Sequence, residues 1–245
     1  MYHFFVNSSQ ISEKTISIIG PDVNHIKNVL RMKLEEQILI SNGEDKGYLC
    51  KLVSIDDEEV TADIIGMGGN GAELPAKIYL FQGLPKSDKM ELIVQKAVEL
   101  GVYEIIPVAT KRAIVKLDEK KEANKIKRWS LIAESAAKQS GRMMIPEVKN
   151  VMTLKEAIDY GKDFDYNLIP YELFQGMYET KEIVKKIEAK NSIGIFIGPE
   201  GGFDETEIEY AKEKGIHPIS LGKRILRTET AGLTILSILM FQLEN

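Results

Sequence analysis

The chain has 245 residues, of which 44% are apolar and 28% are charged, and its formal net charge is −5. This is the composition of an ordinary globular protein, long enough for one large domain or two smaller ones. No apolar run reaches the roughly 18–20 residues of a membrane-spanning helix, and the first ten residues do not form a signal peptide. Because the single cysteine, Cys50, cannot form an internal disulfide, these features together predict a cytoplasmic protein.

The charge is unevenly distributed along the chain. From Lys111 to Lys149 there are 11 Lys and Arg against 5 Asp and Glu, a local charge of +6. A basic face can bind phosphates even on an acidic protein, because salt screens each charge beyond roughly 8–10 Å. For Lys120–Arg128 alone, a solvated helix surface is an equally good interpretation.

The first 72 residues contain short β-rich runs separated by turn residues. One helix is expected over Asp22–Leu30, with Asp22 as its N-cap. Many short strands and one helix favour a small barrel, and the glycine-rich segment Gly66–Gly71 is predicted to be a flexible boundary. The predicted strands are Tyr2–Val6, Thr15–Ile18, Gln37–Ser41, Gly47–Ser54 and Val60–Ile65.

Beyond this boundary, strands alternate with helices. Such alternation predicts a mostly parallel sheet that is covered on both faces. The last helix, about Thr230–Leu243, is apolar nearly all round and too short for a membrane, so we expect it to be buried in the domain or in a dimer interface. The predicted strands are Ile78–Gln82, Glu104–Val108, Tyr166–Ile169, Ile193–Ile197 and Ile216–Ser220.

The strand Ile193–Ile197 runs directly into the glycine-rich segment Gly198–Phe203, and Asp204 and Glu207 then form a capping arrangement for a helix. Glycines at the carboxyl edge of a parallel sheet let bare backbone approach a ligand. The segment matches neither a P-loop nor the Gly-x-Gly-x-x-Gly dinucleotide fingerprint. A tight turn without a ligand is the alternative.

A second polar segment, Leu221–Ala231, leads into the last helix. A helix N-cap at Thr228 or Thr230, with Glu229 favouring the helix dipole, would explain part of it. It would leave three basic residues at a sheet edge unexplained, namely Lys223, Arg224 and Arg227.

Together, Gly-Pro-Glu-Gly-Gly-Phe at residues 198–203 and Leu-Gly-x-x-Ile-Leu-Arg-x-Glu-Thr-Ala at residues 221–231 resemble the RsmE-type methyltransferases. These enzymes modify N3 of a uracil in 16S ribosomal RNA and belong to the trefoil-knotted SPOUT class. The likeness extends over the whole chain, because residues 25–31, 86–101 and 134–142 also look like family motifs.

The resemblance implies an α+β protein of two domains. Residues 1–72 would form a PUA-like β-barrel for RNA recognition, and residues 73–245 an α/β SPOUT domain with a parallel sheet. Its segment of about residues 193–245 would bind the cofactor and thread a deep trefoil knot, which no periodicity predicts. Family members act as homodimers on the small ribosomal subunit.

The implied cofactor is S-adenosylmethionine, wrapped by the two loops and by the loop after Tyr166–Ile169. Glycine-exposed amides and apolar side chains would hold its adenine. The methyl group leaves a sulfonium, and the leaving group is a neutral thioether, so the transfer needs no metal, and alignment of nitrogen, methyl and sulfur supplies much of the acceleration. The residues expected to bind the cofactor are Ile169, Pro170, Glu172, Gly198, Pro199, Gly201, Gly202, Leu221, Gly222, Ile225, Leu226, Thr228, Thr230 and Ala231.

Uracil N3 must lose a proton and leave its base pair before it can react. We hypothesise that Arg227 stabilises negative charge on the uracil carbonyls, with Glu229 or Glu200 as proton acceptor or as orienter of the arginine. A capping role remains the alternative for Glu229.

Seven residues are predicted to contact RNA: His25, Arg31, Lys33, Lys86, Lys89, Lys138 and Arg142. For Lys138 and Arg142 the alternative is a helix C-terminus that favours cations, and His25 is either packed or RNA-facing. The scattered His3, His25 and His217 predict no metal site, and Cys50 is expected in the core.

Two other classes of function compete with this interpretation. A non-catalytic RNA-binding assembly factor would keep the barrel without the chemistry, which the intact cofactor loops disfavour. A nucleotide-dependent oxidoreductase is disfavoured by the missing dinucleotide fingerprint.

Overall fold

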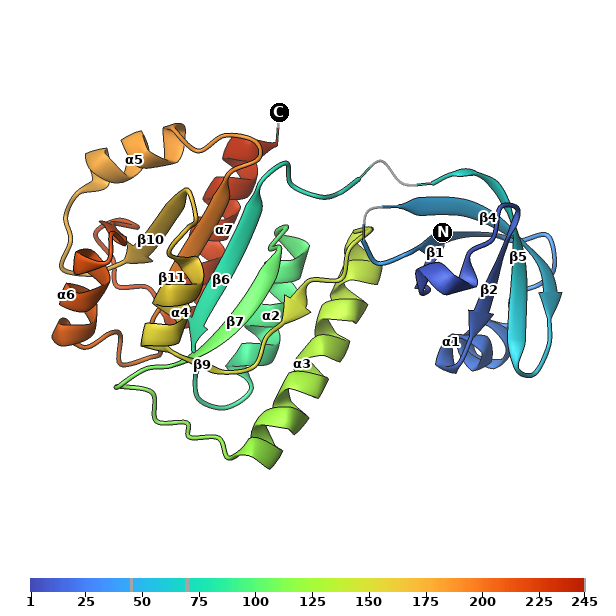
Figure 1. Ribbon diagram of the computed structural model, residues 1–245, viewed down its shortest axis with the longest axis horizontal. Coiled ribbons are helices and arrows are strands. Elements are labelled where there is room, and N and C mark those ends of the chain that lie inside the picture. The colour runs from blue at the N-terminus through green and yellow to red at the C-terminus, as the bar shows by residue number, and fades with distance from the viewer. Residues whose placement is uncertain (45, 69–70, 245) are drawn as a thin grey trace. The chain divides into compact units, whose positions relative to one another are not determined.

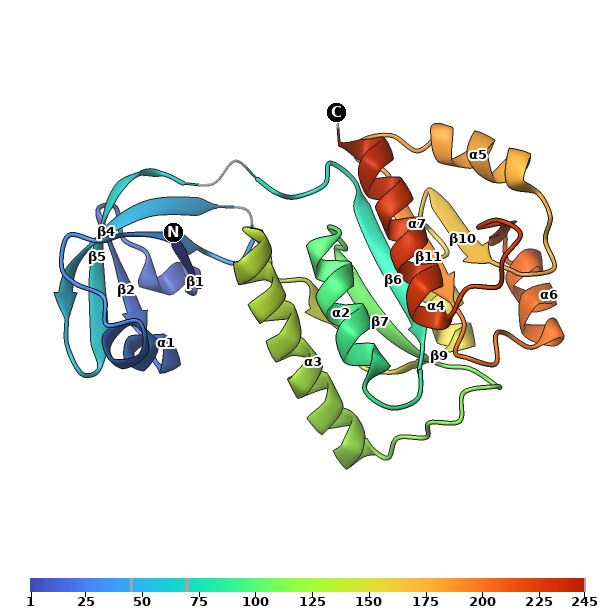
Figure 2. The same cartoon turned by 180° about the vertical axis from the view of Figure 1, so that it is seen from behind.

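The computed structural model describes residues 1–44, 46–68 and 71–244. The chain divides into two compact units, which are drawn from opposite sides in Figures 1 and 2. The first unit comprises Met1–Glu73 together with Ala137–Ile145, and the second comprises Leu74–Ala136 together with Pro146–Asn245.

The first unit is built on a curled five-stranded sheet with the order β1-β3-β4-β5-β2. Strands β1 and β3 pair parallel, whereas the other neighbours pair antiparallel. Alternate residues point inward, so that Ile16, Ile38 and Leu52 are fully buried. Cys50 lies in the same core, as predicted, and burial raises its pKa to about 12. The strands are β1 (Tyr2–Phe5), β2 (Thr15–Ile19), β3 (Gln37–Ser41), β4 (Gly47–Ile55) and β5 (Glu59–Met67).

The helix predicted over Asp22–Leu30 differs from the one observed. A short helix α1 (Pro21–Asn24) continues as a π-helical turn η2 (His25–Val29), and a 3₁₀ turn η1 (Ser8–Gln10) precedes β2. The N-cap is Gly20 rather than Asp22, with φ of 79°. Proline is favoured at the first helical position and glycine tolerates positive φ, so Gly20-Pro21 begins the helix earlier than the aspartate would.

The predicted boundary Gly66–Gly71 is in part a strand. Gly66 and Met67 belong to β5, and the Gly68 amide donates to the Gly47 carbonyl at 2.9 Å. Gly69 and Asn70 lie outside the described residues.

The second unit contains a parallel sheet with the order β12-β10-β11-β6-β7-β8, and β9 also pairs with β7. All its pairs are parallel, as the alternating pattern predicted. The chain proceeds from β6 to β7 and β8 on one side, then crosses to β10 and β11 on the other. The strand order therefore reverses beside β6, which is where α/β sheets open a crevice at their carboxyl edge. The strands are β6 (Lys77–Gly83), β7 (Glu104–Ala109), β8 (Glu147–Val148), β9 (Met152–Thr153), β10 (Tyr166–Pro170), β11 (Ser192–Ile197) and β12 (His217–Ile219).

Helices cover both faces of this sheet. On one face α2 packs against α7, and the two helices lie side by side in Figure 2. On the other face, α4 and α6 bury apolar residues with Phe81 and Phe196 of the sheet, whose rings stack at 4.2 Å. The helices are α2 (Lys89–Glu99), α3 (Glu119–Ser140), α4 (Leu154–Gly161), α5 (Met177–Lys185), α6 (Glu205–Glu213) and α7 (Thr228–Leu243).

Candidate functional site

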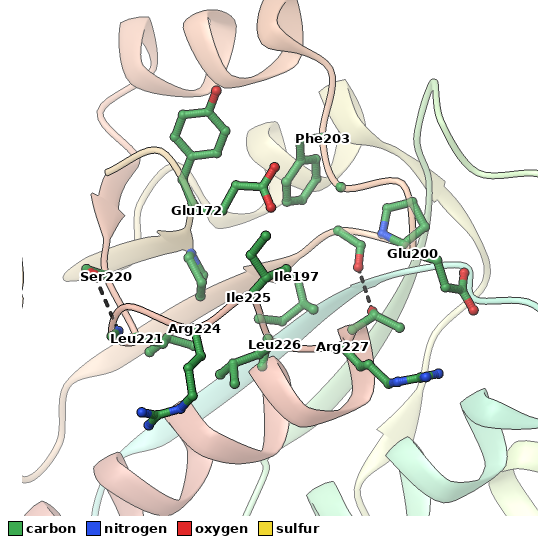
Figure 3. A pocket seen from close by; sticks show the side chains of 18 of the residues that line it. Glu172, Ile197, Glu200, Phe203, Ser220, Leu221, Arg224, Ile225, Leu226 and Arg227 are labelled. Carbon is green, nitrogen blue, oxygen red and sulfur yellow. Dashed lines mark hydrogen bonds between the residues drawn. The ribbon is translucent and has the colours of Figure 1, made fainter. Parts of the chain in front are cut away.

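A cavity of about 350 Å³ lies at the carboxyl ends of β10, β11 and β12. Its volume is within the range of small-molecule sites. Because parallel strands end at the same edge, three loops far apart in the sequence meet here (Figure 3). They follow the three strands at residues 170–172, 198–203 and 220–231, and Lys89 adds a side chain from the start of α2.

The glycine-rich loop, residues 198–203, is packed too closely for side chains at some positions. A Cβ on Gly198 would lie 3.0 Å from the Gly202 backbone, and one on Gly83 of β6 would lie 2.7 Å from the Pro199 nitrogen. Gly202 has φ of 67°, which favours glycine. The glycines therefore bring backbone, and not side chains, to the wall of the cavity.

Three further contacts hold the glycine-rich loop in place. The Thr228 hydroxyl donates to the Gly198 carbonyl at 2.6 Å, and the buried Gln82 donates to the same hydroxyl at 2.9 Å. On the other side, the Arg112 guanidinium donates to the Gly201 carbonyl at 3.2 Å. The predicted capping arrangement of Asp204 and Glu207 is confirmed, so the end of the loop is fixed by the start of α6.

An ion-pair cluster lies beside the loop. The Lys89 ammonium is 3.0 Å from a carboxylate oxygen of Glu200 and 3.3 Å from one of Glu229. The Lys86 amide also donates to Glu200, at 3.1 Å. Burial acts to raise the pKa of Glu200, but hydrogen bonds from the backbone and from Lys89 outweigh it and hold that pKa below its ordinary value. The Glu200 carboxylate is therefore charged at neutral pH, and a paired, low-pKa carboxylate fits an orienting role better than that of a proton acceptor.

The opposite wall, residues 221–227, is more open. Ile225 is 81% exposed although it lines the cavity, and Figure 3 shows it directed between the loops. Arg224 and Arg227 are exposed and point to different sides, with Arg227 on the side of Glu200. The strand before this wall is shorter than predicted, because β12 ends at Ile219. Helix α7 begins at Thr228 with Arg227 as N-cap, so neither Thr228 nor Thr230 caps it.

Most residues predicted to bind a cofactor line this cavity. Three do not: Ile169 is fully buried in β10, Gly201 contacts Arg112, and Thr230 is exposed on α7. Those that line the cavity are Pro170, Glu172, Gly198, Pro199, Gly202, Leu221, Gly222, Ile225, Leu226, Thr228 and Ala231.

Two of the three residues predicted to be catalytic, Glu200 and Glu229, pair with Lys89. The third, Arg227, lies two positions before Glu229 in the sequence. Arg227 and Glu200 line the cavity, whereas Glu229 faces Lys89 from the first turn of α7. Glu229 thus has a partner that a simple helix cap would not require.

The residues predicted to contact RNA fall into two groups. His25, Arg31, Lys33 and Lys86 are exposed, and Arg31 has a positive φ of 52°.

In the second group, each basic side chain already pairs with a carboxylate. Lys138 lies 3.3 Å from Asp22, and Lys89 is held by the carboxylates described above. Arg142 requires a correction, because it is only 2% exposed and its Nε donates to Glu73 at 3.0 Å. A buried guanidinium paired in this way supports the fold of the first unit and is not placed for a phosphate.

Several cavity residues were not among those predicted. They are the last residue of β11, residues within or beside the predicted loops that had no individual role, and one basic residue that was noted without a role. Their position in or next to the predicted loops was the signal that the sequence offered. Position along the chain does not indicate the direction in which a side chain points. They are Tyr171, Ile197, Phe203, Ser220 and Arg224.

Among residues 1–44, 46–68 and 71–244, no group of three or more His, Cys, Asp or Glu side chains is placed to hold a metal ion. In the same part of the chain, no helix is long and apolar enough to cross a membrane.

The fold and the cavity define a two-part α/β protein with a ligand site at the carboxyl edge of a parallel sheet. Residues 72–240 match the model of the RNA methyltransferase domain, and residues 18–65 match the RNA methyltransferase PUA domain.

Two curated relatives are similar over nearly their full length. Ribosomal RNA small subunit methyltransferase E of Bacillus subtilis is 39% identical over 99% of this chain and 96% of its own. The protein of the same name from Mesomycoplasma hyopneumoniae is 37% identical over 97% and 98%. The chain belongs to the ribosomal RNA small subunit methyltransferase E family.

A solved structure is also similar. The crystal structure of ribosomal RNA small subunit methyltransferase E from Neisseria gonorrhoeae, bound to S-adenosyl methionine, has a TM-score of 0.87 and 32% identity. The similarity covers 98% of this chain and 97% of that one.

Proposed function

We propose that this protein transfers the methyl group of S-adenosylmethionine to N3 of a uridine in 16S RNA of the small ribosomal subunit. The observation that carries the proposal is that the two loops, residues 198–203 and 221–231, form facing walls of one cavity. Membership of the family supports the reaction class, and the cofactor-bound relative supports the cofactor.

The residues of the cavity fit this cofactor. Gly198 and Gly202 bring backbone to the wall, which suits an adenine that needs amide donors and acceptors. Leu226 and the exposed Ile225 supply an apolar surface that a bound purine would cover. Glu172 adds a carboxylate on the far side, directed at the cavity in Figure 3. When bound, the cofactor supplies an activated methyl group on a sulfonium.

Arg227 is the residue for which we propose direct contact with the target base. Uracil N3 becomes nucleophilic only when its proton is lost and negative charge spreads to the carbonyl oxygens. An exposed guanidinium at the cavity rim can stabilise that charge. Glu200 and Glu229 are paired with Lys89 and orient the site, and the N3 proton passes to solvent at the open rim of the cavity.

Replacement of Arg227 tests this role. We expect Arg227→Ala to lower the single-turnover methylation rate by about 100- to 1,000-fold, the cost of removing one charge-stabilising donor, while RNA binding persists. An unchanged rate with intact RNA binding would remove Arg227 from the mechanism.

RNA recognition is assigned to the first unit and to the rim of the cavity. We propose that residues 1–72 form the RNA-binding domain and residues 73–245 the catalytic domain, whose segment of about 193–245 threads a trefoil knot. The exposed basic residues Arg31, Lys33 and Lys86, with His25, are the proposed contacts. Lys138 can contribute only if its pair with Asp22 opens.

The proposed assembly is a homodimer in the cytoplasm. Exposed apolar side chains on two helices that pack together support it: Phe241 of α7 is 84% exposed, and Ile238 of α7 and Leu92 of α2 are also exposed. An interface between two copies of the chain would bury such side chains. Light scattering on the purified protein measures the oligomeric state directly.

Mapping of the modified base tests the function as a whole. The purified protein, labelled S-adenosylmethionine and small subunits from cells that lack the protein should yield one labelled uridine. Naked 16S RNA in a parallel reaction separates an RNA substrate from an assembled one. If no label is transferred to either substrate while the protein still binds RNA, a non-catalytic assembly factor is the correct function.

A further inference from the structure

The segment that joins β6 to α2 adopts a conformation that its own sequence disfavours. Ser87 has φ of 56°, in the left-handed region that a serine rarely occupies. Lys89 is the first residue of α2, where the helix dipole repels a cation, and the N-cap Asp88 makes no side-chain hydrogen bond to the helix. Local preferences therefore do not explain this geometry, and tertiary contacts must stabilise it.

Glu200 provides those contacts. Its carboxylate accepts from the Lys86 amide, directly before Ser87, and lies 3.0 Å from the Lys89 ammonium. The same ammonium is 3.3 Å from Glu229. The side chains of Lys89, Glu200 and Glu229 are 26%, 28% and 17% exposed, so the cluster is largely shielded from water.

The cluster joins three segments that surround the cavity. Lys89 begins α2, Glu200 belongs to the glycine-rich loop, and Glu229 lies in the first turn of α7. Glu229 is two residues after Arg227, and Thr228 between them bonds the Gly198 carbonyl. Lys89 and Thr228 thus fix the entrance of α7 to the glycine-rich loop at two points, and the N-cap Arg227 projects from that fixed entrance.

We propose that Lys89 is a positioning residue for methyl transfer, which sets the direction of Arg227 through Glu229 and the place of the glycine-rich loop through Glu200. The inference rests on the proposed function and replaces the expectation that Lys89 contacts an RNA phosphate. A phosphate could pair with the Lys89 ammonium only by displacing the carboxylates of Glu200 and Glu229. These half-buried carboxylates would then lie unpaired beside the phosphate. An ion pair within one helix, such as Lys96 with Glu99 at 2.8 Å, connects no such segments.

The test compares Lys89→Met with two matched variants of the full-length protein. Lys96→Met removes a paired lysine from the same helix, and Lys86→Met removes an exposed lysine from the same loop. For each protein we would measure the single-turnover rate at saturating RNA and cofactor, the affinity for S-adenosylhomocysteine, and the dependence of RNA affinity on salt. Lys89→Arg, whose guanidinium can bridge two carboxylates, serves as the conservative variant.

A positioning role predicts a specific pattern. Lys89→Met should slow the single-turnover rate by about 10- to 100-fold, the effect of a small misplacement at a reacting centre, and leave the salt slope of RNA binding unchanged. Lys89→Arg should recover a substantial part of the rate, and Lys96→Met should match the wild type. Lys86→Met should lower the salt slope by close to one unit, as the loss of a phosphate contact does.

Other outcomes would overturn the proposal. A normal single-turnover rate in Lys89→Met, or a lowered salt slope with the rate restored at saturating RNA, would make Lys89 a phosphate contact. A loss of rate that Lys89→Arg does not restore, with the same loss of S-adenosylhomocysteine affinity, would make it a structural residue only. If the wild-type protein itself transfers no methyl group, the proposed function fails, which is distinct from any of these results.

Discussion

The two loops that enclose the cavity differ in how firmly the rest of the protein holds them. The glycine-rich loop is bonded through Gly198 to Thr228, through Glu200 to Lys89 and through Gly201 to Arg112. The loop of residues 221–227 instead presents exposed side chains, above all Ile225 at 81%. We infer that the first wall is preformed and that the second adjusts to a ligand. Binding on a preformed wall avoids much of the entropic cost of ordering a loop.

We expect the largest effect on stability and on ligand affinity from a substitution at Gly83, which lies directly behind the glycine-rich loop. In Gly83→Ala the new Cβ would lie 2.7 Å from both the nitrogen and the Cδ of Pro199. The loop would have to shift, and we expect a loss of about 1–3 kcal/mol in the free energy of unfolding and at least a roughly tenfold weaker affinity for S-adenosylhomocysteine. Calorimetric titration and thermal unfolding measure the two effects. Gly66→Ala is the control, because a Cβ there meets nothing within 4 Å. Wild-type affinity in Gly83→Ala would contradict a rigid first wall.

An intermediate effect is expected on the open wall. Ile225→Ala removes apolar surface that only a ligand would cover, so we expect the affinity for S-adenosylhomocysteine to fall by about 1–1.5 kcal/mol. The free energy of unfolding should change by less than about 0.5 kcal/mol, as for an exposed site. Ile114, which is also largely exposed at 68% and lies outside the cavity lining, supplies the control Ile114→Ala. If Ile225→Ala instead destabilised the free protein, the second wall would be preformed as well.

We expect the smallest effect on the pH dependence of the free energy of unfolding. The pKa of Glu200 in the folded protein lies below its ordinary value of 4.5. The unfolded chain therefore takes up this proton first on acidification. The stabilisation from the carboxylate is complete above pH 4.5 and is lost as the pH falls through the lower pKa. Urea unfolding of wild type and Glu200→Gln should show a constant difference at neutral pH that narrows only below pH 4.5. Glu205→Gln, at an exposed residue of α6, is the control, and a difference that already narrowed between pH 7 and 6 would show that Glu200 is not held as an anion.

Much of the fold was predictable because each unit has a simple local sequence pattern. Short β-rich runs separated by turn residues predicted the strands of the first unit, and alternation of strands with helices predicted the parallel sheet. The errors lie at element ends, where one residue decides the outcome. Gly20 and Pro21 begin α1 in place of Asp22, and Arg227 caps α7 in place of a threonine.

The site was predictable to the level of its loops. Glycines and charges at the end of an apolar strand indicate which segments reach the carboxyl edge, and both loops do line the cavity. The pairing of charges was not predictable, because Lys89 is 111 positions from Glu200 and Arg142 is 69 from Glu73. Lys89 and Arg142 therefore had the sequence signature of phosphate contacts, whereas the fold places each beside a carboxylate.

The sequence by itself determined the two classes of element and the two loops that carry the chemistry, since these depend on local spacing and on the conformational freedom of glycine. Only the tertiary structure decided which charges are free. Whether a lysine or arginine faces solvent or a carboxylate depends on which chain segments meet at a sheet edge, and that is set by strand order. For this protein, strand order brings β6, β11 and the entrance of α7 together, and so places Lys89 between Glu200 and Glu229 while Arg227 stays exposed at the cavity.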